Sequence, residues 1–132
     1  MNKINWSSLV LRVFLGIMFT GHGLQKAFGL FGGMGISGFA HILTNLGIPF
    51  PLFFAYLVTF VELVGGIFLI LGIFVRTFSF LLLIDMIVAI LTVNISKGFF
   101  LPGGFEYNFI IISVCIALIL MGPGKYSIKD KF

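Results

Sequence analysis

Few side chains in this sequence could do chemistry, and most of them lie within long apolar stretches. Glu62 and Asp85 are each flanked by apolar residues, and His22 closes an apolar run near the start of the chain. An ionisable side chain in such a setting is costly to bury, so it is usually paired or lines a cavity. A carboxyl group beside a histidine could accept or release a proton. Proton exchange is therefore the chemistry that these residues favour.

The composition indicates what kind of element carries these groups. Of the 132 residues, 60% are hydrophobic and 9% are charged, whereas soluble domains carry roughly 25% charged residues. A helix needs roughly 20 mostly apolar residues to cross a membrane, and unbroken apolar runs fit helices better than the alternating strands of a barrel. The sequence therefore predicts one all-α domain, 1–132, an integral membrane four-helix bundle with transmembrane helices over 5–28, 51–74, 77–95 and 108–122.

Counting along these helices places the polar groups in two layers. At 1.5 Å per residue, Arg12 and Asp85 both lie roughly 10 Å from the side where the chain begins, so they are predicted to form a structural ion pair. Glu62 lies roughly 20 Å from that side, and His22 and Asn94 roughly 25 Å. In this count no Lys or Arg shares the level of Glu62. The outer layer is the predicted ligand site, with Glu62 and His22 as candidate catalytic groups; the alternative is that Glu62 only hydrogen-bonds neighbouring helices.

The connection between the first two predicted helices has helical periodicity of its own. Within segment 36–46, Ile36, Phe39 and Leu43 fall on one face, and His41 falls elsewhere. This spacing predicts a short amphipathic helix at the membrane interface, capping the outer end of the bundle. His41 would then lie over the ligand site.

The distribution of cations predicts the orientation. Lys3, Arg76 and the lysines of the C-terminal tail fall on one side of the predicted bundle, and only Lys26 and Lys97 fall on the other. Because cytoplasmic loops are rich in Lys and Arg, both termini are expected in the cytoplasm. The net charge of +4 is then explained by topology and anionic lipid, and no basic stripe with exposed aromatics indicates nucleic-acid binding.

Several chemistries have no support in the sequence. The single cysteine, Cys115, lies in an apolar stretch, which excludes an internal disulfide and a Cys-x-x-Cys pair. The histidines, His22 and His41, lack the usual metal-ligand spacings, so no metal site is predicted; a haem held between the two histidines stays geometrically open. Redox work by this chain would need a borrowed cofactor.

Short motifs along nearly the whole chain resemble those of the DoxX family. They are GHGLQK at 21–26, GIPFP at 47–51, ELVGG at 62–66, LGIFVR at 71–76, GGFEY at 103–107 and GPGKYS at 122–127. The third helix of the family commonly closes with a histidine, where this chain has Asn94. This departure argues against any role that needs a second histidine in the membrane.

The resemblance implies a small four-helix protein of the bacterial inner membrane. The family takes its name from a subunit related to thiosulfate:quinone oxidoreductase, and members have been linked to quinone or thiol redox stress. The resemblance therefore implies a redox accessory that binds a quinone-like or other small apolar ligand and is at most a subunit of a membrane oxidoreductase. The expected partners are the lipid bilayer, an oxidoreductase and a second copy of the chain. A non-enzymatic scaffold subunit or a small-molecule permease is the alternative.

Overall fold

The computed structural model describes residues 3–100, 102 and 104–128. The described chain is helical and has no strand, which confirms the predicted all-α class. The elements in chain order are α1 (Lys3–Phe28), α2 (Gly35–Asn45), α3 (Pro51–Leu71), α4 (Val75–Ala89), the π-helix η1 (Ile90–Asn94), the 3-10 helix η2 (Ile95–Lys97) and α5 (Glu106–Met121).

The long helices have the dimensions of membrane spans. Among the described residues, three stretches are long and apolar enough to cross a bilayer, namely Lys3–Phe28, Pro51–Leu71 and Val75–Lys97, and α5 is apolar but shorter, with 16 residues. The helix α3 ends at Leu71, earlier than the predicted 74, because Gly72 and Phe74 adopt left-handed backbone conformations with φ of 78° and 48°. A left-handed glycine directly after the last turn is a common way to end a helix.

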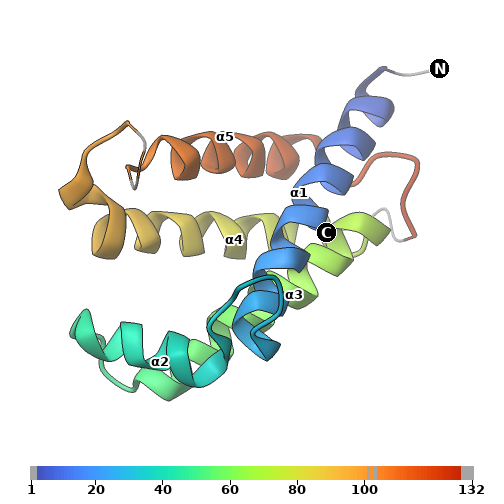
Figure 1. Ribbon diagram of the computed structural model, residues 1–132. Helices are drawn as coiled ribbons and strands as arrows, with labels where there is room; N and C mark the ends of the chain where they lie inside the picture. The colour runs from blue at the N-terminus through green and yellow to red at the C-terminus, as the bar shows by residue number, and fades with distance from the viewer. Residues whose placement is uncertain (1–2, 101, 103, 129–132) are drawn as a thin grey trace.

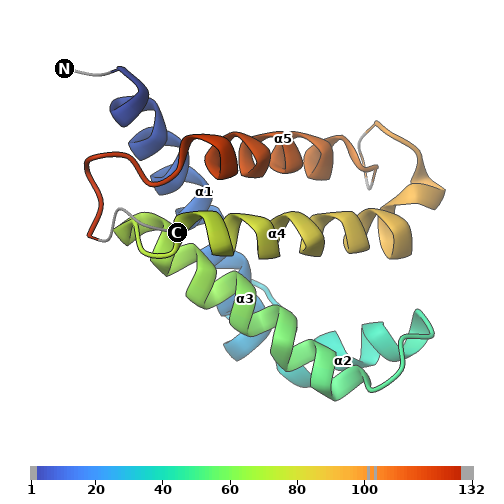
Figure 2. The same ribbon diagram turned by 180° about the vertical axis from the view of Figure 1, so that it is seen from behind.

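The helices form two crossing pairs (Figure 1). In one pair α1 packs on α3, and in the other α4 packs on α5, while α2 lies against α3 and α1. The view from behind shows the same pairs and places α2 and the α4–α5 connection at one end of the molecule (Figure 2). The start of α1 and segment 122–128 lie together at the opposite end. We call these the outer end and the terminal end.

Glycines set the close approach of α1 and α3. A Cβ atom on Gly23 would lie 2.6 Å from the Cα of Leu63, and one on Gly66 would lie 2.6 Å from the backbone N of Thr20. No side chain larger than hydrogen fits at these positions without moving a helix backbone. Gly21 differs, because nothing lies within 4 Å of the position its Cβ would take.

This difference gives a matched pair of substitutions. Gly23→Ala is expected to lower the free energy of unfolding by about 1–3 kcal/mol, because the methyl group must push α1 away from α3. Gly21→Ala is expected to be neutral or to stabilise by up to about 1 kcal/mol, since alanine favours the helix more than glycine does. Thermal unfolding in one detergent measures both, and equal losses in the two variants would contradict the packing.

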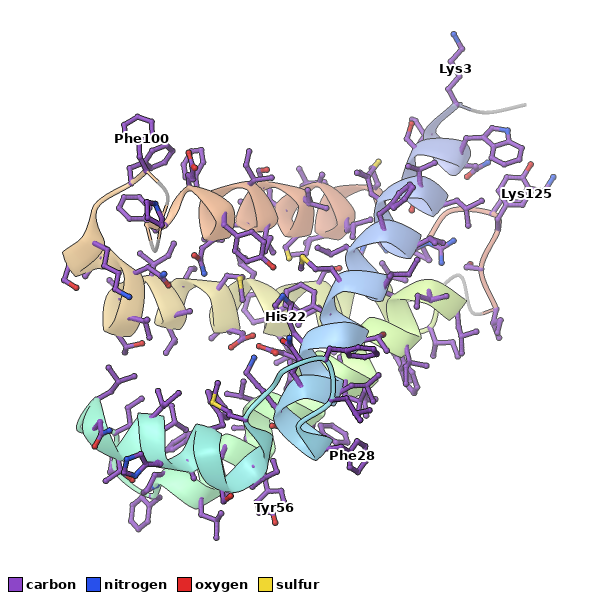
Figure 3. The ribbon with its side chains drawn as sticks, viewed as in Figure 1. Lys3, His22, Phe28, Tyr56, Phe100 and Lys125 are labelled. Carbon is purple, nitrogen blue, oxygen red and sulfur yellow. The ribbon has the colours of Figure 1, made fainter. Side chains whose placement is uncertain are left out.

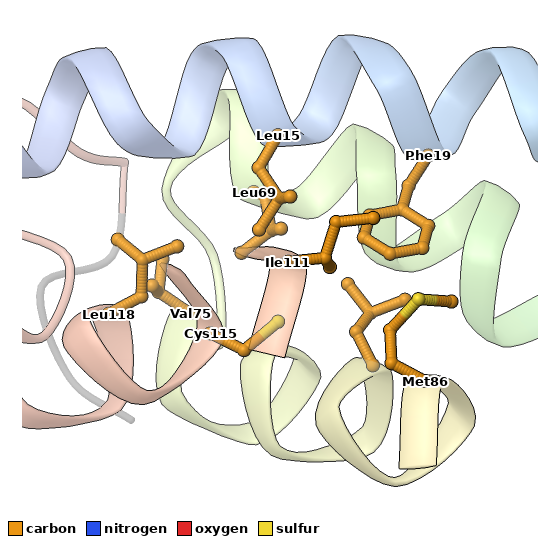
Figure 4. Close-up of a cluster of buried hydrophobic side chains, with 9 residues drawn as sticks. Leu15, Phe19, Leu69, Val75, Met86, Ile111, Cys115 and Leu118 are labelled. Carbon is orange, nitrogen blue, oxygen red and sulfur yellow. The ribbon is translucent and has the colours of Figure 1, made fainter. Parts of the chain in front are cut away.

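A shared apolar core joins the two pairs (Figure 4). Leu15 and Phe19 from α1 and Leu69 from α3 meet side chains from both α4 and α5, including Cys115. Cys115 is a free cysteine that is fully buried among apolar neighbours. Its thiol therefore packs as a small apolar group in this core.

The predicted amphipathic cap is present as α2. Leu43 is buried, and Ile36 and Phe39 are half-buried on the same side of the helix. His41 is exposed and makes no hydrogen bond or ring contact with any described residue. The apolar face of α2 therefore covers the outer half of α3 (Figure 2), and His41 lies on the exposed side of α2.

Arg12 is fully buried at the terminal end, where it meets backbone carbonyl groups. Its Nη1 donates to the carbonyl oxygens of Leu69 at 3.0 Å and Ile70 at 3.5 Å, and its Nη2 donates to that of Tyr126 at 2.5 Å. The last carbonyls of a helix have no partner within the helix and carry partial negative charge. Arg12 therefore caps α3 and holds the tail beside it.

Further contacts join α1 to the tail. Ser8 Oγ donates to the carbonyl of Gly122 at 2.8 Å, and the backbone N of Lys125 donates to Asn5 Oδ1 at 3.0 Å. The rings of Trp6 and Tyr126 lie 4.9 Å apart. We call the contacts of Asn5, Trp6, Ser8 and Arg12 with segment 122–128 the terminal clasp.

The predicted ion pair between Arg12 and Asp85 is not found, since Arg12 meets the carbonyls described above and Asp85 lies beside Glu62. The reason is that the first turns of α1 lie level with the tail that follows α5, beyond the end of α3. Counting residues from the start of α1 therefore overestimates how far Arg12 lies from the end of the bundle. It lies at the edge of the bundle, whereas Asp85 lies well inside α4.

Candidate functional site

Lys26 and Glu62 form an ion pair between α1 and α3. Lys26 Nζ lies 2.7 Å from Glu62 Oε1, and 4% of the Glu62 side chain is exposed. Side chains on a helix point back toward its N-terminus, so Lys26, in the last turn of α1, reaches inward to the level of Glu62. The close approach of α1 and α3 at Gly23 shortens this reach. The prediction that no cation shares the level of Glu62 is therefore wrong.

Phe39 completes the surroundings of Lys26. Lys26 Nζ lies 5.2 Å from the centre of the Phe39 ring, which belongs to the buried face of α2. An ammonium group over an aromatic face is stabilised by the negative face of the ring. The residue by which α2 covers the site is thus Phe39.

Asp85 adds a second carboxyl group. It faces Glu62 at hydrogen-bonding range, and its Oδ2 is buried without a hydrogen-bond partner among the described residues. Two adjacent carboxylates repel one another strongly in an apolar environment, and Lys26 supplies one positive charge. We call Lys26, Glu62 and Asp85 the acid triad.

His22, one helical turn before Lys26 on α1, belongs to a group of hydrogen-bonded side chains. Its Nε2 lies 3.0 Å from the hydroxyl of Tyr107 on α5, and its Nδ1 lies 3.0 Å from Gln25 Oε1. The Tyr107 hydroxyl also lies 3.0 Å from Met18 Sδ. Figure 3 shows His22 where α1 crosses the other helix pair. The ring therefore connects α1 to α5 through polar atoms.

An apolar groove runs between α1 and α5 and reaches the hydrogen-bonded side chains around His22. Its volume is about 680 Å³, and its walls include Leu11, Phe14, Met18, Tyr107, Ile110 and Val114. Phe14 and Ile110 are largely exposed, so the groove opens on the outer surface of the bundle. Met18 and Tyr107 line the groove and also belong to the hydrogen-bonded side chains around His22. A ligand in the groove would therefore meet a polar residue there.

The remaining predicted residue, Asn94, lies in the π-helix η1. It is half-buried at the outer end of α4, beyond Asp85 in the chain. A π-helix inserts an extra residue into a turn and is frequent at functional sites. Within residues 3–100, 102 and 104–128, no three His, Cys, Asp or Glu side chains gather as metal ligands would.

Four residues of the site were not recognised from the sequence as parts of it. Gln25 and Lys26 follow His22 at spacings of three and four, which places them on one face of α1; that spacing could have revealed them. Tyr107 and Phe39 come from other elements, and their places depend on how α5 and α2 pack. No local pattern marks them.

Comparisons with known proteins agree with the membrane fold. Residues 7–95 match the DoxX family. The chain is 34% identical over 119 residues to "Putative oxidoreductase CatD" of Bacillus subtilis (strain 168), a match that covers 89% of this chain and 83% of that protein. It is 31% identical over 138 residues to "Uncharacterized membrane protein Rv3486" of Mycobacterium tuberculosis (strain ATCC 25618 / H37Rv), with 95% and 80% covered.

No solved structure matches the chain significantly. The family match spans more than half of the sequence, and both relatives cover most of it. The long apolar helices and the motifs around His22 and Glu62 are in accord with that match. The chain is therefore a membrane protein that belongs to the DoxX family.

Proposed function

We propose that this protein is a redox accessory subunit that binds a quinone-like ligand between α1 and α5 and serves a partner oxidoreductase. The observation that carries the proposal is the apolar groove of about 680 Å³ whose wall includes Tyr107, the residue that meets His22 through its hydroxyl. Ligand sites are typically concave, mostly apolar and furnished with a few polar groups. A quinone has the matching form, with polar ring oxygens and an apolar body.

Proton exchange supports the same ligand class. Reduction of a quinone to its hydroquinone takes up two protons, and α1 carries both His22, which meets Tyr107, and Lys26, which belongs to the acid triad. In this proposal a partner protein supplies the electrons. The name of the Bacillus subtilis relative, an oxidoreductase, supports such a partnership.

Quinone retention on purification tests this proposal. The protein, reconstituted in vesicles that contain both a quinone and its hydroquinone and then extracted in mild detergent, is expected to carry bound quinone in one of these two forms, measured by solvent extraction and absorbance. Val114→Trp places a large ring in the groove and is expected to abolish retention. Ile84→Trp is the matched control, because Ile84 is exposed on α4 away from the groove and should leave retention unchanged.

The outcomes separate the alternatives. Loss of quinone from Val114→Trp alone supports the groove as the site. A wild-type protein that carries no quinone and still co-purifies with an oxidoreductase would overturn ligand binding and favour a scaffold subunit. Vesicles that take up a small apolar solute only when the protein is present would favour a permease.

We also propose four membrane passes in a bacterial inner membrane, with α5 as the fourth and both termini in the cytoplasm. The terminal clasp supports a common side for the two ends, because Lys125 bonds to Asn5 and Tyr126 stacks on Trp6. The bias of Lys and Arg supports the cytoplasm as that side.

An impermeant thiol reagent on intact cells tests this topology. With Cys115→Ser as the background, a cysteine at Ser37 in α2 is expected to be labelled, and one at Lys125 is expected to be labelled only after the cells are opened. Both positions are exposed in the structure, and denatured protein serves as the labelling standard. The reverse pattern would contradict the proposed orientation.

A further inference from the structure

The amide of Gln25 is held in one orientation by the loop that follows α1. Gln25 Nε2 donates to the carbonyl oxygen of Phe31 at 3.2 Å. Of the two ends of an amide, only the NH₂ group can donate to a carbonyl. The other end, Oε1, is thereby fixed toward His22 Nδ1, 3.0 Å away.

The loop is folded tightly to make this contact. Phe31 has a left-handed backbone with φ of 53°, which non-glycine residues adopt only at a cost. A Cβ on Gly33 would lie 2.5 Å from the Cα of Gln25, so the loop backbone rests directly on that residue. The loop thus accepts backbone strain at the place where its carbonyl group orients Gln25.

The orientation of Gln25 determines the tautomer of His22. An amide oxygen only accepts hydrogen bonds, so the proton of a neutral His22 ring lies on Nδ1 and Nε2 carries the lone pair. The nearest partner of Nε2 is the Tyr107 hydroxyl at 3.0 Å, which must then be the donor. Met18 Sδ, also at 3.0 Å, is a weak acceptor and competes poorly for that proton.

We propose that Gln25 is a positioning residue that fixes His22 with its proton on Nδ1, so that Tyr107 presents its oxygen to the groove as an acceptor, and that the ligand is taken as the hydroxyl-bearing hydroquinone form. The ligand part of this inference rests on the proposed function. With the proton of Tyr107 directed to His22, the phenolic oxygen of this groove residue can act toward a ligand only as an acceptor. A ligand hydroxyl satisfies that oxygen, whereas a ligand carbonyl does not.

The tautomer is measured without any ligand. The chain has two histidines, so His41→Asn leaves the ¹⁵N imidazole signals of His22 alone, and His41 is exposed and outside the site. Protein labelled with ¹⁵N-histidine, in detergent at pH 8, is expected to show a protonated Nδ1 and an unprotonated Nε2. A proton on Nε2 in this protein would overturn the assignment, and no site variant is needed to see it.

Two variants at Gln25 test its role. Gln25→Leu removes the acceptor, so the proton is expected to move largely to Nε2. Gln25→Glu still accepts from Nδ1 and is expected to keep the tautomer. An unchanged tautomer in Gln25→Leu, or the same change in both variants, would overturn the positioning role.

The ligand form is tested with two probes of nearly equal size. Decyl-substituted hydroquinone, kept anaerobic, is expected to bind at least about tenfold more tightly than its dimethyl ether, which lacks the hydroxyl donors. Gln25→Leu is expected to remove this preference. Equal binding of both probes would overturn the hydroquinone inference. Binding of neither probe would overturn the proposed function. The tautomer of His22 is measured separately and does not depend on either result.

Discussion

Replacing Arg12 by Met is expected to lower the free energy of unfolding by on the order of 3 kcal/mol or more. The side chain is fully buried, and its guanidinium donates to the carbonyls of Leu69, Ile70 and Tyr126. Each hydrogen bond from a charged donor contributes about 1.5–3 kcal/mol, and the carbonyls left behind would be buried without partners. Thermal and denaturant unfolding in detergent measure the loss.

Two controls identify the origin of that loss. Arg76→Met removes an exposed arginine whose Nε donates to one carbonyl, that of Ile119 at 2.9 Å, and should cost about 1 kcal/mol. Combining Arg12→Met with Asp85→Asn should give additive losses, because the two side chains do not pair. If the double variant loses less free energy of unfolding than the two single variants together, Arg12 and Asp85 interact. That result would support the ion pair predicted from the sequence.

Replacing Lys26 by Met is expected to cost about 3 kcal/mol, because it leaves the carboxyl groups of Glu62 and Asp85 buried without a cation. Breaking a buried ion pair by removing one partner typically costs 3–5 kcal/mol, and the partial exposure of the Lys26 side chain, 19%, places the effect at the lower end. Lys97→Met is the matched control, since Lys97 is exposed at the same end of the molecule and should change stability by less than about 0.5 kcal/mol.

A compensating change distinguishes lost charge from lost packing. Lys26→Met together with Glu62→Gln should recover much of the stability, because the double replacement removes one buried negative charge along with the cation that balanced it. The same unfolding measurement reports the recovery. A double variant as unstable as Lys26→Met would show that Lys26 acts through its contact with Phe39 and not through Glu62.

The sequence predicts the helical elements well because local patterns determine them. The long apolar runs predict the spans, and the spacing of Ile36, Phe39 and Leu43 predicts the buried face of α2. These features depend on residues within a few turns of one another. Hydrophobic periodicity is the strongest signal that a single sequence carries.

The pairing of polar groups depends on geometry that the sequence does not contain. A depth count treats helices as equal and aligned, yet α1 extends beyond α3, which moves Arg12 to the end of the bundle. It also treats a side chain as a point, whereas the long side chain of Lys26 reaches Glu62 from the last turn of α1. Tyr107 meets His22 only because the two helix pairs cross where they do.

The terminal clasp has a consequence for how the protein is made. The acceptors of Arg12 lie 57 residues later in the chain at Leu69 and 114 residues later at Tyr126. At translation rates of about 5–20 residues per second, on the order of 10 s separates the synthesis of Arg12 from that of Tyr126. During that time the guanidinium must stay hydrated at the membrane surface, which its place near the end of the bundle allows. Only a chain translated past Tyr126 can bury this charge, so closure of the clasp is a late step in the folding of the bundle.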